Sequence, residues 1–375
     1  KMISVREKKS FINYDLIVIG GGLTGMFCAL SFINKKPKSK VLILERGILP
    51  SGASTKNAGF ATFGSLSEII SDNKTLSDNS VFNLVEKRVL GLELLKKTIP
   101  KANLNIKNYG GYELIFKNHF DLEMLIEKYN KLLYPIFNDN IFFQAKEKIK
   151  LFGFSKTKLT NLIFNPYESQ IDPGETVFKL QRILLSKGVN IINGANVQDF
   201  DYSGNAFEII TQNDNEIIKF KSTLMAICSN AFAKKWFPNE DINPGRGMII
   251  VTKPLKDLKF KGSFHYNEGF NYFRNFKKRV IIGGGRNLDF KSEATSQFGI
   301  NKFIKKSLIN DLHNIILQNQ EFEIDMEWSG IMAFGSSKEP IVKKLSDRSV
   351  LAVRLGGIGV SISSILGKEA SELRL

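Results

Sequence analysis

The sequence predicts an α/β protein in which a Rossmann-type dinucleotide-binding domain is interleaved with an α+β domain built on an antiparallel sheet. Three observations predict this fold. A glycine-rich loop directly follows a strand-length apolar run near the N-terminus. Alternating apolar and polar runs, typical of strands with one covered face, occur within residues 106–164 and 246–324. The length of 375 residues corresponds to about two domains.

The elements of a dinucleotide-binding βαβ unit occur in register at the N-terminus. An apolar strand leads into a GxGxxG loop, and a helical stretch, a second apolar strand and an acidic residue follow at the expected distances. These elements are residues 14–19, the loop Gly20-Gly21-Gly22-Leu23-Thr24-Gly25, residues 26–34, residues 41–44 and Glu45.

Each residue of this unit has a physical task in binding a dinucleotide. Gly20 allows the tight turn, Gly22 lets the backbone approach a pyrophosphate, and Gly25 lets helix and strand pack closely. The helix N-terminus then holds the phosphates. We expect Glu45 to accept a hydrogen bond from the adenosine ribose. This unit alone leaves NAD and FAD open.

Composition and charge narrow the class of protein. The chain is 43% hydrophobic and 24% charged, as in ordinary globular proteins. Its two cysteines, Cys28 and Cys228, exclude a disulfide framework and a cysteine-rich metal site. The net charge of +16 suits a polyanion, but the lysines are spread along the chain without a long basic run. We therefore do not favour a nucleic-acid partner, but the net charge does not exclude one.

The N-terminus gives no sign of export. Residues 1–10 are polar and lack an apolar segment before a cleavage site, so we expect a cytoplasmic protein without a signal peptide. Residues 16–33 form the one membrane-like run. Its glycines and charged neighbours indicate a buried strand–turn–helix instead of a transmembrane span.

Residues 51–60, with the sequence SGASTKNAGF, carry a family resemblance. Together with the upstream unit, this small-residue loop resembles the D-amino-acid oxidase-like family of FAD-dependent oxidoreductases, which includes glycine, sarcosine and γ-glutamylputrescine oxidases. In that family the loop passes near the flavin. The resemblance implies FAD as the cofactor, and it continues through residues 171–197, 224–231, 327–332 and 355–370.

The motifs and the resemblance together nominate a set of cofactor-binding residues. They lie in the glycine loop, at the end of the second strand, in the 51–60 loop and in the later segments that resemble the family. They are Gly20, Gly22, Leu23, Thr24, Gly25, Glu45, Arg46, Ser51, Ala53, Ser54, Asn57, Ala58, Gly59, Val197, Ser229, Gly330, Gly356, Gly357, Ile358, Gly359 and Val360.

Two expectations accompany the FAD assignment. Sarcosine oxidases of the family attach flavin through a cysteine in the C-terminal third or a histidine near the nucleotide loop. Neither Cys28 nor Cys228 matches that tether, and no histidine closely follows Glu45, so we expect non-covalent FAD. The three histidines, His119, His265 and His313, lack metal-ligand spacing, and no metal is expected.

The order of these segments predicts interleaved domains. The FAD-binding domain is expected from residues 10–105, 165–245 and 325–375, and the substrate domain from residues 106–164 and 246–324.

The resemblance implies oxidation of a C–N bond in an amine or N-substituted amino acid. A hydride passes to flavin N5, and the imine product hydrolyses. Only one dinucleotide fingerprint is present, because Gly283–Gly285 lacks the GxGxxG spacing, so the electron acceptor would be oxygen, a quinone or a protein. The substrate amine, the acceptor and the oligomeric state are not specified by the sequence.

The chain departs from its relatives where they bind a substrate carboxylate. Glycine-oxidase-like enzymes use an arginine after the W-S-G segment and another before the terminal glycine turn, where this chain has Met332 and Gly357. Arg274 and Tyr272, two apart on a predicted strand, are therefore our candidates for holding the substrate.

Two further candidates for the substrate or flavin site have purely structural alternatives. Arg246 could bind an anion between the domains or form a structural ion pair. Lys56 could interact with the flavin edge or be a solvated loop lysine.

Two other functions remain open at this stage. One is a flavin-dependent tRNA-modifying enzyme, which the charge of +16 would suit. The other is a flavin-binding assembly factor with little turnover. Salt-sensitive tRNA binding would indicate the first, and a flavin that no amine reduces would indicate the second.

Overall fold

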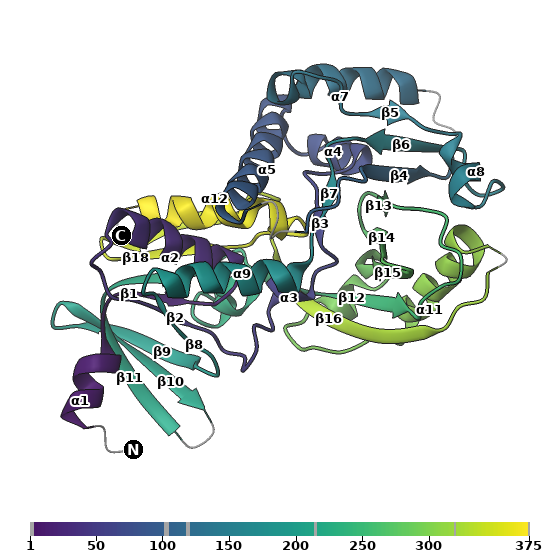
Figure 1. Ribbon diagram of the computed structural model, residues 1–375. Coiled ribbons are helices and arrows are strands. Elements are labelled where there is room, and N and C mark those ends of the chain that lie inside the picture. Colours follow the sequence, from purple (N-terminus) through teal and green to yellow (C-terminus); the bar gives the residue numbers. More distant parts are fainter. Residues whose placement is uncertain (1–3, 101–104, 118–120, 214–215, 319, 374–375) are drawn as a thin grey trace.

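Two eight-stranded sheets form the body of the protein, as Figure 1 shows for the computed structural model. The structure describes residues 4–100, 105–117, 121–213, 216–318 and 320–373. The first sheet has the order β17-β18-β11-β1-β2-β8, and β9 and β10 extend it from β11. Its strands are β1 (Asn13–Ile19), β2 (Val41–Leu44), β8 (Asn190–Ile192), β9 (Asn196–Ser203), β10 (Ala206–Asn213), β11 (Glu216–Ile227), β17 (Ile341–Ser346) and β18 (Ser349–Val353).

The centre of the first sheet is parallel, as the Rossmann pattern predicts. Strand β1 pairs in parallel with both β2 and β11, and β11 pairs in parallel with β18. Leu16 and Val18 of β1 pack into the core beneath the helices, whereas Ile17 and Ile19 join the core on the other face. Burial on both faces explains why the run is apolar throughout.

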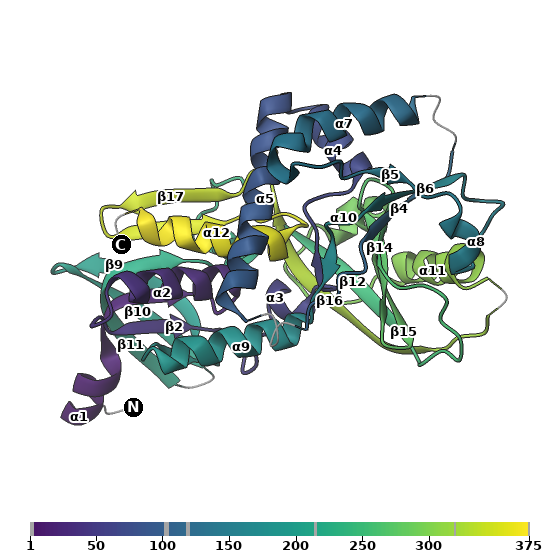
Figure 2. The ribbon, with the colours of Figure 1, turned by 45° about the horizontal axis from the view of Figure 1, so that its top comes forward.

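Four helices cover one face of this sheet, and their side chains belong to a single core (Figures 1 and 2). The C-terminal helix packs against the helix that follows the glycine loop and against the long helix that rises toward the second sheet. The four are α2 (Leu23–Lys35), α5 (Asp78–Thr98), α9 (Pro173–Ser186) and α12 (Gly359–Glu372).

The second sheet has the order β16-β12-β15-β14-β13-β4-β6-β5. It is antiparallel except for one pair, β4 with β13, which runs parallel. These two strands come from the two separate segments of the domain, so no hairpin joins them. The strands are β4 (Gly111–Ile115), β5 (Phe143–Gln144), β6 (Asn161–Asn165), β12 (Asn243–Thr252), β13 (Ser263–Tyr266), β14 (Asn271–Phe276), β15 (Arg279–Gly284) and β16 (Ile324–Phe334).

An aromatic core covers one face of the second sheet. The rings of Phe264 and Phe273 stack at 4.6 Å, and Ile304 and Leu308 of α11 (Lys302–Asp311) pack into the same cluster. The opposite face is therefore the one available to the first domain.

One predicted domain boundary falls within a strand. Residue 325 was expected to begin the last segment of the FAD-binding domain, but β16 pairs along its length with β12 in the second sheet. A two-stranded sheet of β3 (Phe60–Ala61) and β7 (Ser169–Gln170) lies near the junction (Figure 1). In the described part of the chain, no helix is both long and apolar enough to cross a membrane.

The remaining helices are short or peripheral. They are α1 (Val5–Glu7), η1 (Lys8–Ile12), α3 (Ala53–Lys56), α4 (Leu66–Asn73), α7 (Leu122–Phe137), α8 (Lys148–Phe152), η2 (Asn230–Lys235), η3 (Arg286–Leu288), α10 (Phe290–Glu293) and η4 (Leu312–Ile316).

Candidate active site

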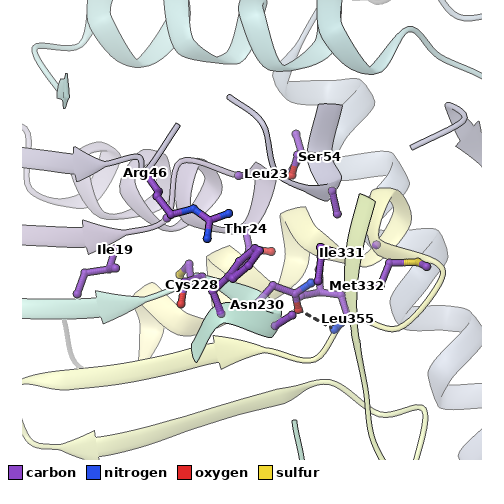
Figure 3. A pocket seen from close by; sticks show the side chains of 18 of the residues that line it. Ile19, Leu23, Thr24, Arg46, Ser54, Cys228, Asn230, Ile331, Met332 and Leu355 are labelled. Carbon is purple, nitrogen blue, oxygen red and sulfur yellow. Dashed lines mark hydrogen bonds between the residues drawn. The ribbon is translucent and has the colours of Figure 1, made fainter. Parts of the chain in front are cut away.

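A cavity of about 470 Å³ lies at the carboxyl ends of β1, β2 and β11 (Figure 3). This is the edge at which parallel α/β sheets bind their ligands. Fifteen of the nominated cofactor residues line it. They are Gly20, Gly22, Leu23, Thr24, Glu45, Arg46, Ala53, Ser54, Asn57, Val197, Ser229, Gly356, Gly357, Gly359 and Val360.

The other nominated residues do not line this cavity. Gly25 lies under the loop, Ala58 and Gly59 continue toward the second sheet, and Gly330 lies beneath Lys56. Ser51 and Ile358 are neighbours in sequence of lining residues.

The glycines of the loop are required by close contacts. Gly20 has φ +112°, and a Cβ there would lie 2.7 Å from the carbonyl oxygen of Cys228. A Cβ on Gly25 would lie 2.0 Å from the carbonyl oxygen of Gly20, so helix α2 packs directly on the turn. Side chains at these positions would fill the space that the loop needs.

The Glu45 carboxylate organises the same turn. It accepts hydrogen bonds from the backbone N–H groups of Gly21 at 3.0 Å and Gly47 at 2.9 Å. The side chain also lines the cavity, and a carboxylate has more acceptor positions than these two bonds use. Its position is thus compatible with an additional hydroxyl donor from a ligand.

The 51–60 loop is held in place from within. Ser54 Oγ accepts a hydrogen bond from the backbone N–H of Leu23 at 2.9 Å, which ties the loop to the start of α2. The Asn57 amide donates to the carbonyls of Ala53 and Ser54, and its oxygen accepts from the N–H of Gly59. The loop is therefore a shaped wall of the cavity.

The cavity fits a dinucleotide. The α2 N-terminus, capped by Gly22 without a side-chain hydrogen bond, opens onto it, as phosphate binding requires. Ser229 Oγ is buried and has no hydrogen-bond partner among the described residues, although Ser229 lines the cavity. A ligand oxygen would satisfy this hydroxyl.

Sequence reasoning missed a group of lining residues after β11. Phe232, Lys235 and Trp236 line the cavity. The Arg46 guanidinium lies 3.8 Å from the centre of the Phe232 ring. Lys235 Nζ donates to the Val197 carbonyl at 2.6 Å. A signal was present, because β11 pairs with β1 and its carboxyl end must lie beside the glycine loop. Residues following that strand were candidates on this ground alone.

Further missed residues close the opposite wall. Figure 3 shows Asn230 beside Leu355, with Ile331 nearby. The backbone N–H of Leu355 donates to the side-chain oxygen of Asn230 at 3.4 Å. The missed lining residues are Ile19, Leu44, Gly52, Ala195, Asn196, Cys228, Asn230, Ala231, Phe232, Lys234, Lys235, Trp236, Pro244, Ser296, Ile331, Met332, Leu355 and Ser363.

Residues 56–60 lie across the free face of the second sheet. The Trp328 indole N–H donates to the Lys56 carbonyl at 2.9 Å, and the Phe60 ring meets Tyr272 edge-on at 5.6 Å. Ala58 packs with Ile249 in the same small cluster. This segment connects the cofactor cavity to the second domain.

Arg274 makes contacts within the protein that the sequence did not predict. It is only 4% exposed, and its Nη1 donates to the carbonyls of Gly59 at 2.7 Å and Ile171 at 2.9 Å. Burial lowers its pKa to about 10, against the opposing charge of Asp172. Arg274 thus fixes the 57–60 segment to the sheet, and these contacts do not place its guanidinium on a substrate.

Arg246 is engaged in an ion pair. Its Nε and Nη2 donate to the two carboxylate oxygens of Glu293 at 3.0 and 2.8 Å. Glu293 is buried, so this bidentate pair is structural, the alternative that the sequence left open. Arg354, just before the terminal glycine turn, is likewise paired with Asp241 at 2.7 Å.

Tyr272 and Lys56 remain near the junction. Burial raises the pKa of Tyr272 to about 12, so its hydroxyl stays protonated and can donate a hydrogen bond. Lys56 Nζ lies 5.5 Å from the centre of the Phe298 ring.

A buried network lies beside Tyr272 on the same face. His265 is the cross-strand neighbour of both Tyr272 and Glu113, and its Nε2 lies 2.9 Å from Glu168 Oε2. Burial alone would lower the pKa of His265, but the charges of Glu168, Glu68 and Glu113 raise it to about 9. Burial raises the pKa of Glu113 to about 7 despite its hydrogen bond from Ser67.

Protein stability should therefore fall as pH rises. The folded protein binds the His265 proton more tightly than the unfolded chain, so this stabilisation is complete below pH 6.5 and is lost as pH passes 9. Glu113 acts in the same direction between pH 4.5 and 7. We expect the free energy of unfolding to drop by up to about 3 kcal/mol between neutral pH and pH 9.

Thermal unfolding of wild type and His265→Gln across this range checks the prediction. The fall in stability with rising pH should be smaller in His265→Gln. It should persist in the control His313→Gln, because the His313 side chain is exposed. An equal dependence of stability on pH in all three proteins would contradict the prediction.

The third histidine, His119, lies outside the described residues.

The cysteines favour non-covalent FAD. Cys28 and Cys228 are both buried, and a hydrogen bond to Cys28, together with burial, raises the pKa of Cys228 well above its usual value. A thiol held in its neutral form is a poor nucleophile. Acid precipitation of the holoenzyme should release all flavin into the supernatant, and colour retained in the pellet would contradict this prediction.

Comparisons with known proteins agree with this arrangement. A D-amino acid dehydrogenase of Helicobacter pylori is 23% identical, and the match covers 96% of this chain and 94% of the relative. L-proline dehydrogenase from P. horikoshii superposes with a TM-score of 0.77 at 16% identity, over 96% of this chain and 93% of that structure. Glycine oxidase from Geobacillus kaustophilus also gives 0.77 at 16% identity, over 97% and 95%.

The family itself is shown by a match over nearly the whole chain. The model of the family described as FAD dependent oxidoreductase, DAO, matches residues 15–373. The expected fold and the expected cofactor are thereby confirmed. The chain belongs to the DAO family and is an FAD-dependent oxidoreductase.

Proposed function

We propose that the protein oxidises the C–N bond of an amine or N-substituted amino acid to an imine, which water then hydrolyses. The names of the relatives given above indicate that those proteins act on D-amino acids, L-proline and glycine. One observation supports a site of this kind in this chain. The cofactor cavity reaches Met332 and Pro244, next to a glycine-rich area on the free face of the second sheet.

Four glycines form the floor of this area, which we call the glycine floor: Gly245, Gly247, Gly283 and Gly330. A Cβ on Gly247 would lie 2.7 Å from the Met332 side chain, and one on Gly283 would lie 2.8 Å from Tyr272. A Cβ on Gly330 would lie 3.3 Å from that of Lys56. The missing side chains let Met332, Tyr272, Lys56 and Phe334 lie close against the strands, and a small substrate would lie beside these side chains, where Met332 borders the cofactor cavity.

Bound FAD supplies the hydride acceptor for this reaction. The protein's own contribution is to hold the amine and to shape the charge around it. Tyr272 offers a protonated hydroxyl to the floor, and Met332 and Phe60 bring apolar surface that limits water. The N-terminus of α12, which starts at Gly359 in the cavity wall, would supply positive potential to a bound cofactor.

The test is anaerobic reduction of the holoenzyme by a panel of amines, N-methyl amino acids, cyclic amino acids and polyamines. At least one member should bleach the visible flavin absorbance with saturation. If dithionite bleaches the flavin and no amine does, the proposal fails and a low-turnover flavoprotein is indicated. Salt-sensitive tRNA binding by the same preparation would instead favour the RNA-modifying alternative.

A further inference from the structure

Arg286 stands out among the buried and half-buried arginines. Its guanidinium lies over two aromatic rings, 3.8 Å from the centre of the Phe334 ring and 4.8 Å from that of the Phe290 ring. The chain turns at Gly285, with φ +74°, as it leaves β15, so that the Arg286 side chain crosses above β12. Its Cδ lies 3.6 Å from the position that a Cβ of Gly245 would take.

This guanidinium has no hydrogen-bond acceptor or carboxylate partner among the described residues. Arg88, Arg246, Arg274 and Arg354, in contrast, all donate to carbonyl or carboxylate oxygens. The nearest acidic influence on Arg286 is Glu293.

No hydrogen bond joins Glu293 to Arg286 in the described part of the chain, and the Glu293 carboxylate is engaged by other donors. Arg246 binds both of its oxygens, and the Asn301 amide donates to one of them at 3.1 Å. Burial lowers the pKa of Arg286, yet an arginine remains charged at neutral pH. A half-buried charge without a partner carries a desolvation cost that an anionic ligand would offset.

Its place in the fold puts Arg286 beside the glycine floor. Gly245 is the cross-strand partner of Met332, and Pro244 and Met332 both line the cofactor cavity. Cross-strand partners share a face of a sheet, so Gly245 and Met332 lie on the face that holds Gly247 and Gly330, and the Arg286 side chain reaches this face at Gly245. The unpaired guanidinium therefore borders the area in which the proposed substrate would lie.

We propose that Arg286 binds a carboxylate of the substrate and so selects amino acids over plain amines. The proposal rests on the proposed function and names the substrate class for that site. Contacts with Phe290 and Phe334 hold the guanidinium in place, and the planar fork of an arginine matches a carboxylate with two parallel hydrogen bonds. Arg286 takes the role that sequence reasoning gave to Arg274.

The first experiment compares each reducing amino acid with its carboxamide in wild type, Arg286→Met and Arg286→Lys. In wild type, kcat/KM should favour the carboxylate. In Arg286→Met, kcat/KM should fall about thirtyfold or more for the carboxylate and little for the carboxamide. A fall of this size is in the range for truncating one member of a charge pair. Arg286→Lys should recover part of the loss, because lysine keeps the charge and lacks the fork.

The matched control is Arg182→Met on the exposed side of the first domain. Arg182 also lies over a phenylalanine ring, 5.9 Å from that of Phe178 on α9, far from the glycine floor in sequence and in sheet. Its kinetics should equal those of wild type. Equal losses with carboxylate and carboxamide in Arg286→Met, together with a lower Tm, would assign Arg286 to a structural stack and overturn the proposal.

A second experiment needs no turnover. Titration of the holoenzyme with benzoate should perturb the visible flavin spectrum with saturation in wild type and Arg182→Met, and the affinity should fall tenfold or more in Arg286→Met. If no amine reduces the flavin but this pattern is observed, the proposed function fails and the anion site stands. An absent perturbation in wild type, or an unchanged affinity in Arg286→Met, would overturn the anion site. Tighter saturation by inorganic phosphate than by benzoate would also overturn it, by pointing to a phosphorylated substrate.

Discussion

Replacing Gly25 by alanine should strip the protein of most of its FAD and destabilise the fold. The added Cβ would lie 2.0 Å from the backbone oxygen of Gly20 and 3.1 Å from the Val18 side chain. A backbone atom cannot move aside as a flexible side chain can, so α2 must shift away from the turn that it packs on. We expect the free energy of unfolding to fall by about 1–3 kcal/mol or more, the range for overpacking a core.

The measurement is FAD per chain after gel filtration, with thermal unfolding alongside it. Gly174→Ala is a matched control, because Gly174 also lies in the first turn of a helix of the same domain, and its Cβ would meet only Asp172 at 3.4 Å. That control should retain FAD and gain slightly in stability, since alanine is the better helix former. Wild-type FAD content in Gly25→Ala would contradict the close packing of loop and helix.

Replacing Arg274 by methionine should destabilise the protein and impair the cofactor site at the same time. The change removes the Arg274 donor of the buried Ile171 carbonyl, and an unsatisfied buried acceptor costs about 1–3 kcal/mol. The Gly59 carbonyl loses one of two donors and keeps the bond from the Ile171 N–H. Gly59 follows the loop that walls the cavity, so we expect lower FAD content together with lower Tm. A pure substrate contact would instead raise KM and leave Tm unchanged.

Arg279→Met provides the comparison for Arg274→Met. Arg279 begins β15 of the same sheet, donates to the Thr252 carbonyl at 3.0 Å and pairs with Asp325, but its side chain is partly exposed and lies far from the 57–60 segment in sequence. It should lose little stability and no FAD. If Arg274→Met keeps its Tm and FAD while KM rises strongly, the original interpretation of Arg274 as a substrate residue would be restored.

The cofactor half of the site could be predicted because its signals are local. The strand, the glycine spacing and Glu45 lie within one βαβ unit, whose geometry brings them to the same edge of the sheet. Residues after β11 escaped notice although their place follows from the same rule. Phe232 and Lys235 carry no motif, and only the pairing of β11 with β1 shows where they lie.

The substrate half could not be predicted, because partners distant in the sequence decide what each arginine does. Arg246, Arg274 and Arg286 all lie in or beside strands of the second sheet and look alike as sequence. Glu293 neutralises the first, and the carbonyls of Gly59 and Ile171 occupy the second. Arg286 alone of the three is left with aromatic rings and no acceptor among the described residues. The parallel β4–β13 pair was likewise hidden, because it joins two separate segments.

A single anaerobic turnover tests the central claim, that this chain uses FAD to oxidise a C–N bond. The holoenzyme is mixed with an acyclic amino acid that bleaches its flavin, and in parallel with the 2-hydroxy acid of the same skeleton. The account predicts about one carbonyl product and one released nitrogen compound for each FAD reduced, with no reduction by the hydroxy acid. Reduction by the hydroxy acid alone, or flavin bleaching without release of nitrogen, would contradict it.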